Sequence, residues 1–146
     1  MILLKYNEAN NVVVTLTEKQ TFTPLQYLFI FKSGNLGKQY GCAADNISTF
    51  TGRYNEFIIT QSSTPDLLNG VITLGEGGYY SYTIYGIDEV LDLTELTAAI
   101  QMSQSELETA YTVELLETGK MRYIKTPTAM TEFKAATENK TVFQNT

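Results

Sequence analysis

The side chains in this sequence that could do chemistry are carboxylates, tyrosines and one cysteine, because the chain contains no histidine. Histidine is the most frequent general base and a common zinc ligand, so its absence excludes Ser-His-Asp and Cys-His catalysis. With no histidine to activate it, Cys42 is expected to be a small buried apolar residue and not a nucleophile. A single cysteine also excludes a disulfide within the chain.

Paired carboxylates occur in one acidic stretch, at Asp88 and Glu89, Asp92 and Glu95, and Glu106 and Glu108. Asp88–Glu95 lacks the central glycine of a calcium loop, so solvated carboxylates are expected there. The Gly75–Gly78 segment has the glycines of a phosphate cradle but not the following Gly-Lys-Ser/Thr, which favours a turn. The sequence therefore predicts a protein that is not an enzyme and that holds no cofactor and no metal.

Tyrosines alternate in Val71–Gly86, VITLGEGGYYSYTIYG. In a strand, Tyr80, Tyr82 and Ile84 would lie on one face. The opposite face would carry Tyr79, Ser81, Thr83 and Tyr85. A glycine-rich turn followed by Gly78-x-Tyr80-x-Tyr82-x-Ile84 resembles the corner before strand F of immunoglobulin-like sandwiches, where a tyrosine hydroxyl bonds back to upstream backbone and its ring enters the core.

Composition favours one β-rich domain. Of the 146 residues, 43% are hydrophobic and 18% are charged, which is enough to bury a core. Ten tyrosines and seven phenylalanines favour sheet over helix. The apolar start MILL is too short for a signal peptide, and no stretch approaches the ~20 apolar residues of a membrane span. Synthesis in a cytoplasm without membrane insertion is expected.

Charge is distributed unevenly along the chain. Residues 54–119 contain eleven Asp or Glu and no Lys or Arg, whereas residues 1–53 and 120–146 are both net positive. An acidic middle argues against nucleic acid, because each phosphate contact needs a cation. Two interpretations remain: a solvated face that aids solubility, or attraction between opposite charges of neighbouring copies or other partners.

Short strands separated by turns are expected in the first half of the chain. They fall at Val12–Thr17, Leu25–Lys32, within Lys38–Phe50, at Glu56–Gln61, at Val71–Leu74 and in the tyrosine segment. Ile87–Thr112 has no glycine or proline, and Ser103 with Glu106 fits a capping box, which predicts one or two short helices. Val113–Leu116 and Lys120–Lys125 are expected as strands around a turn at Glu117–Gly119, and a returning strand here is expected to pair beside the tyrosine strand.

The expected fold class is all-β: an immunoglobulin-like antiparallel β-sandwich. Residues 1–126 form the sandwich, in which residues 87–112 are a long acidic, part-helical connection before the last strand. Residues 127–146 form an extended C-terminal tail.

Several segments together resemble the small immunoglobulin-like virion proteins of tailed bacteriophages, in particular the crAss-like type. The segments are NNVVVTLTEK, LFIFKS, FTGRYNEFIIT, NGVITLGEGGYYSYTIYG, ELLETGKMRYIK and ENKTVFQNT. The resemblance implies a structural virion protein, an auxiliary or decoration protein of the capsid, in which Tyr80 is the corner tyrosine and Tyr82 takes the core position that a cysteine holds in antibody domains.

Partners are then other virion proteins, either the major capsid protein or neighbouring copies in a homo-oligomer. The expected partner contacts are apolar residues at the two ends of the chain: Met1, Ile2, Leu3, Tyr6, Val142 and Phe143. Two other interpretations stay open. One is a head-fibre anchor or a neck or tail protein, and the other is a module that binds host-surface glycans through Tyr79 or Tyr85.

Overall fold

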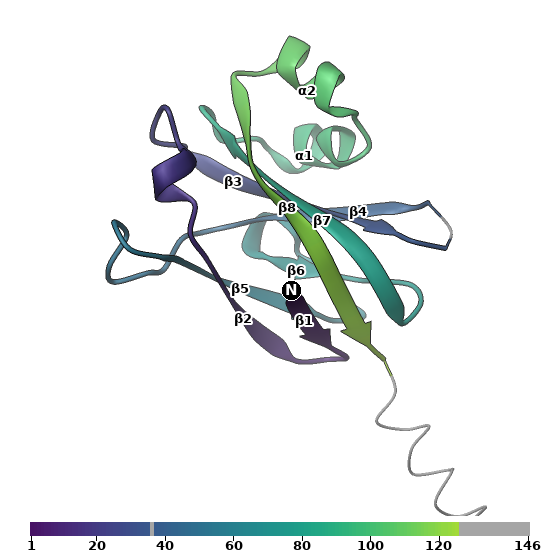
Figure 1. Ribbon diagram of the computed structural model, residues 1–146. Coiled ribbons are helices and arrows are strands. Elements are labelled where there is room, and N and C mark those ends of the chain that lie inside the picture. Colours follow the sequence, from purple (N-terminus) through teal and green to yellow (C-terminus); the bar gives the residue numbers. More distant parts are fainter. Residues whose placement is uncertain (36, 126–146) are drawn as a thin grey trace, which may run out of the picture.

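Eight strands form two hydrogen-bonded sheets in residues 1–35 and 37–125, which the computed structural model describes (Figure 1). The five-stranded sheet has the order β1 (Ile2–Lys5), β8 (Val113–Ile124), β7 (Gly78–Ile87), β3 (Gln26–Ser33) and β4 (Gln39–Ala44). The three-stranded sheet has the order β2 (Ala9–Val14), β5 (Asn55–Gln61) and β6 (Val71–Ile72). The chain is therefore mostly β, as expected.

The strands are not all antiparallel, so the expectation of a purely antiparallel arrangement is wrong. β8, β7, β3 and β4 are antiparallel neighbours, but β1 runs parallel to β8 and β6 runs parallel to β5. Parallel neighbours cannot be joined by a tight hairpin. β1 and β8 satisfy this condition because they come from opposite ends of the described chain, and the intervening strands and helices connect them.

Aromatic rings hold the two sheets together. The ring of Phe57 from β5 meets Tyr27 and Phe29 of β3 edge-on, with centroids 5.1 and 4.9 Å apart. Such edge-to-face pairs add to the gain from burial alone. The residues of this inner core alternate with outward-facing ones along each strand, and Phe29, Phe57 and Ile84 are fully buried within it.

Two short helices cover part of the opposite face of the five-stranded sheet (Figure 1). They are α1 (Leu93–Ile100) and α2 (Gln104–Ala110), which confirms helices within residues 87–112. Both begin with a capping box: Asp92 with Glu95, and Ser103 with Glu106. Apolar residues of the helices and the preceding loop pack on β3, β4 and β7 in a second core of Leu28, Ile30, Ala43, Tyr85, Ile87, Leu91, Leu96, Ala99, Ile100 and Leu107.

The first long strand begins and ends earlier than expected. β2 is Ala9–Val14, not Val12–Thr17, and Asn10 and Asn11 already pair with β5. It ends because the Asn55 side-chain oxygen accepts the backbone N–H groups of Leu16 and Thr17 at 2.7 and 3.2 Å. The buried Asn55 thus replaces the sheet ladder with a side-chain cap and turns the chain toward β3.

The turn expected at Glu117–Gly119 does not exist, because β8 is continuous from Val113 to Ile124. Gly119 lies opposite Tyr82 in the β7–β8 ladder, and a Cβ atom at Gly119 would lie 2.7–2.8 Å from the Tyr82 ring. Glycine at position 119 makes room for the Tyr82 ring of the neighbouring strand, and such close approach is a common reason for a glycine inside a strand.

We expect Gly119→Ala to lower the free energy of unfolding by about 2 kcal/mol, because the added methyl must displace the buried Tyr82 ring. Gly52→Ala is the matched control, since a Cβ at Gly52 meets nothing within 4 Å. Denaturant unfolding of both variants measures the difference. Equal stability of the two variants would contradict the assigned role of Gly119.

Candidate functional site

A groove runs along the seam where β1 approaches β2. β1 pairs with only the last part of β8, from Met121 to Ile124. The groove has a volume of about 480 Å³, and it is lined by Met1, Ile2, Leu3, Asn11, Val12, Val13, Val14, Thr15, Tyr82 and Glu117. Its polar floor is formed by Tyr82 and Glu117, and the expected partner residues Met1 and Leu3 lie at its edge.

The polar floor is internally satisfied. The Tyr82 hydroxyl donates to Glu117 Oε2 at 2.6 Å, and Lys19 Nζ lies 3.2 Å from Glu117 Oε1. Burial, together with the hydrogen bond to Glu117 and its charge, raises the pKa of Tyr82 well above its usual range. The Tyr82 hydroxyl thus stays protonated and donates its hydrogen bond, and the Glu117 carboxylate links β7 to the 3₁₀ turn Thr17–Lys19. This triad of Tyr82, Glu117 and Lys19 cross-links β7, β8 and the 3₁₀ turn.

The expected corner residue Tyr80 bonds to upstream backbone. Its hydroxyl donates to the carbonyl oxygen of Glu76 at 2.6 Å, and its buried ring meets Tyr40 edge-on at 6.1 Å. Gly78 begins β7 with a φ of 135°, a conformation that L side chains rarely adopt. The turn and the hydrogen bond together fix where the tyrosine strand enters the sheet.

The tyrosines on the other face of β7 divide into two environments. Tyr85 is buried beneath the helices, at 6% exposure, so it is not available to a glycan. Tyr79 is 59% exposed, and the guanidinium carbon of Arg122 lies 5.7 Å from its ring centroid. Tyr82 and Ile84 lie in the inner core, on the side expected from the alternation.

The N-terminal segment is part of the fold, which corrects the expectation that Ile2 contacts a partner. Ile2 and Leu4 point into the inner core at 5% and 0% exposure. Met1, Leu3 and Tyr6 remain exposed. A period-two pattern in ILLK was the available signal for a strand, because alternate residues of a half-buried strand face the core. Val142 and Phe143 lie outside the described residues.

Cys42 and several of the carboxylates considered from the sequence are buried or bonded within the fold. Cys42 is fully buried, and burial raises the pKa of its thiol to about 12. Asp92 and Glu95, expected as solvated carboxylates, and Glu106, expected in a capping box, each accept a hydrogen bond from a backbone N–H group at a helix start. Over residues 1–35 and 37–125, no group of three or more His, Cys, Asp or Glu residues is placed to hold a metal ion.

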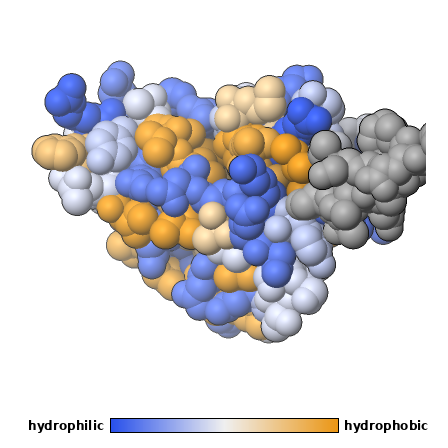
Figure 2. All heavy atoms as spheres, turned by 90° about the horizontal axis from the view of Figure 1, so that it is seen from below, coloured by the Kyte–Doolittle hydropathy of each residue, from blue (hydrophilic) through white to orange (hydrophobic). Residues whose placement is uncertain are grey.

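Apolar side chains also reach the surface outside the groove. Viewed from below, hydrophobic patches are interrupted by hydrophilic residues (Figure 2). Val13 of β2 and Ile58 of β5 are 60% and 42% exposed. In the described part of the chain, no helix is long and apolar enough to cross a membrane.

Comparison with known proteins returned no relative. A scan against protein-family models and searches of curated proteins and of solved structures found no match to this chain.

Truncating Leu4 tests whether the N-terminal strand belongs to the core. Leu4→Ala should lower the free energy of unfolding by about 2–5 kcal/mol, because it leaves a cavity at a fully buried position. The neighbouring Leu3→Ala is a matched control on the same strand and should change it by about 0.5 kcal/mol or less. Denaturant unfolding measures both, and a similarly small effect at the two positions would exclude the assigned packing of β1.

The corner hydrogen bond predicts a pH dependence. Burial, the largest cause, raises the pKa of Tyr80 from 10.0 to about 12. Above pH 10 the unfolded chain ionises this hydroxyl while the folded chain does not, so stability is present below pH 10 and is lost between pH 10 and about 12. Tyr80→Phe should destabilise the protein at pH 7 by about 1 kcal/mol and make the alkaline decline shallower. Urea titrations across this range measure the slope, with Tyr79→Phe as the exposed control. Parallel slopes for Tyr80→Phe and the original protein would exclude this role.

Proposed function

We propose that the chain is a structural, non-enzymatic component of a bacteriophage virion, with an immunoglobulin-like sandwich as its framework. The role that we propose first is that of an auxiliary or decoration protein that binds neighbouring capsid subunits. The observation that carries the proposal is the use of the reactive side chains: the Tyr82–Glu117–Lys19 triad, the helix-capping carboxylates and Cys42 all serve the framework.

The strand order supports an immunoglobulin-like framework. Sheets of immunoglobulin domains pack with Greek-key connections, and a tyrosine near the start of strand F bonds back to the backbone. β7 has the position of that strand, between β3 and the last strand β8, and Tyr80 at its start donates to Glu76. The division into one sheet of β1, β8, β7, β3 and β4 and another of β2, β5 and β6 also supports it, although β6 runs parallel to β5.

The sequence segments that resemble virion proteins support the particle assignment. NGVITLGEGGYYSYTIYG contains the corner, and ELLETGKMRYIK forms the strand that pairs with it. An adhesive role asks only for a rigid framework and exposed contact groups, and the described chain offers both. A head-fibre anchor or a neck or tail protein would use the same framework.

A glycan-binding module on the host surface is a second candidate, favoured by one observation. Tyr79 presents an exposed ring beside Arg122, and aromatic rings with a flanking polar group are frequent where proteins bind small polar ligands. Tyr85, the other tyrosine considered for this role, is buried.

Quantitative mass spectrometry of particles from the phage that encodes the chain tests the proposal. We expect the chain at a fixed ratio to the major capsid protein, retained through density-gradient purification and high-salt washing. Density for its two sheets in a cryo-EM map would then distinguish a capsid position from a fibre, neck or tail position. Synthesis of the chain in infected cells without its presence in particles would overturn the virion assignment.

A further inference from the structure

The helices cover only one half of the outer face of the five-stranded sheet. Leu28 and Ile30 of β3 and Tyr85 of β7 are buried under them. The same face continues past the helices, where Lys32 of β3 and Tyr79 of β7 are exposed. We call this uncovered part the bare half and the α1–α2 part, residues 88–110, the helical half.

The bare half is basic. Its exposed, outward-facing cations come from three strands: Lys5 of β1, Lys32 of β3, and Lys120 and Arg122 of β8. The register places them in rows: Lys32 lies opposite Ser81, which lies opposite Lys120. Outward-facing positions of these strands hold no Asp or Glu, and the ion pair found in the described residues, Lys19–Glu117, lies elsewhere.

The bare half also has relief and an aromatic centre. Tyr79 stands between two hollows of about 310 and 380 Å³. Lys32 and Lys120 line the first hollow, and Arg122 and Lys125 line the second. Aromatic and arginine side chains are the types enriched at the energetic centres of protein interfaces. Tyr79 and these cations form one cluster because pairing of β3, β7 and β8 brings separate segments of the chain together. The sequence pattern alone does not show this cluster.

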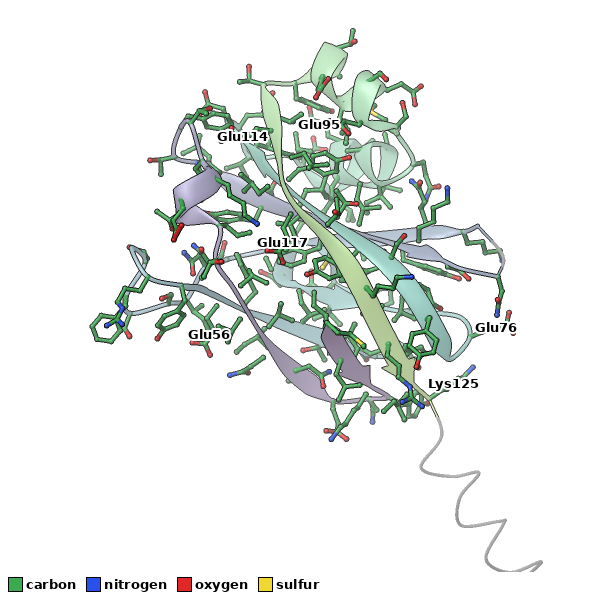
Figure 3. All side chains as sticks on the ribbon, viewed as in Figure 1. Glu56, Glu76, Glu95, Glu114, Glu117 and Lys125 are labelled. Atoms are coloured by element: carbon green, nitrogen blue, oxygen red, sulfur yellow. The ribbon has the colours of Figure 1, made fainter. Side chains whose placement is uncertain are left out.

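The helical half has the opposite charge. Residues 88–110 contain six acidic residues and no Lys or Arg: Asp88, Glu89, Asp92, Glu95, Glu106 and Glu108. They lie on a raised layer, and Val90 and Leu93 among them are 67% and 53% exposed. Glu95 lies at this end of the molecule and Lys125 at the opposite end of β8 (Figure 3). The charges are therefore separated along the sheet.

We propose that two copies of the chain pair through their outer faces, with the helical half of each copy covering the bare half of the other. Both halves lie on the same side of the sheet and at opposite ends of it, so a two-fold axis that is parallel to the sheet and perpendicular to the line joining the two halves brings each half against its complement twice. The raised helices of one copy then lie beside those of the other. Within one copy, the helices already cover the helical half of the sheet. In the dimer, the apolar and acidic helices of the second copy cover the bare half.

Charge favours a second copy over a nucleic acid as the occupant. A single strand stacked on Tyr79 would match an aromatic and basic groove. The formal net charge of the chain is −6, however, and a phosphate backbone extended along the sheet from the bare half would meet the carboxylates of the helical half. A second copy turns those same carboxylates into contacts.

Sedimentation velocity of the full chain at several concentrations tests the pairing. We expect a monomer–dimer equilibrium with no larger species, weakened when salt is raised from about 0.05 to about 0.5 M. Lys120→Glu should raise the dimer dissociation constant by about tenfold or more, since the change occurs at both contacts of a two-fold dimer. Arg53→Glu, the same charge reversal at an exposed residue outside the bare half, should leave it unchanged.

Exchange of charges identifies the opposing surface. Glu89→Lys combined with Glu108→Lys avoids the helix caps and should also weaken self-association. Mixing this variant with Lys120→Glu should restore a dimer containing one copy of each. Circular dichroism verifies that each variant is folded.

Three results would overturn the proposal: a monomer at all concentrations, open-ended assembly, or failure of the mixed variants to pair. Binding of an oligothymidylate that Lys120→Glu abolishes, with no dimer in its absence, would assign the face to nucleic acid instead. The measurements use purified protein without particles, so their failure leaves the proposed virion role standing.

Discussion

The fold depends on β7 having a hydrophobic core on each of its faces. Tyr82 and Ile84 pack between the sheets, while Tyr85 and Ile87 pack under the helices. Because successive side chains of a strand point to opposite faces, one ten-residue strand supports both clusters. Its position is set at one end by the Tyr80–Glu76 hydrogen bond and along its length by the β3 and β8 ladders. A shift of one residue would exchange the two faces, so both cores oppose it.

Polar side chains form the hydrogen bonds and the ion pair that attach the connection between β2 and β3 to the sheets. Asn55 ends β2, Glu117 joins Tyr82 to Lys19, and Glu114 accepts from both the backbone N–H and the hydroxyl of Thr21 at 2.8 Å. Glu114 and Glu117 thus hold the connection between β2 and β3 against β8, and Asn55 holds the start of that connection against β5. Buried or half-buried polar groups that are fully bonded specify one packing, whereas unpaired ones would be costly. The carboxylates of Glu114 and Glu117 therefore bond to partners within the fold.

Local patterns in the sequence predicted those parts of the fold that local physics decides. The inner face of the tyrosine strand, the capping box at Ser103 and Glu106, and the return of the last strand beside β7 follow from periodicity and side-chain reach. Distant contacts decided the rest. β1 pairs with Met121–Ile124, far away in the sequence, so no turn signal beside β1 predicts this pairing. Gly119 was interpreted as part of a turn, but it makes room for the Tyr82 ring. The sequence alone did not indicate the basic cluster around Tyr79, because its cations come from three strands far apart in sequence.

The charge asymmetry exceeds what the framework needs. Asp92, Glu95 and Glu106 are explained by capping, since carboxylates near a helix start bond to free N–H groups and favour its dipole. Glu89 has no such task among the described hydrogen bonds and ion pairs, and no cation offsets it between residues 54 and 119. Like charges so placed repel one another and cost stability in an isolated copy. Their compensation must come from outside the fold, from solvent ions or from an opposing basic surface, and the bare half of the same sheet is a surface of that kind.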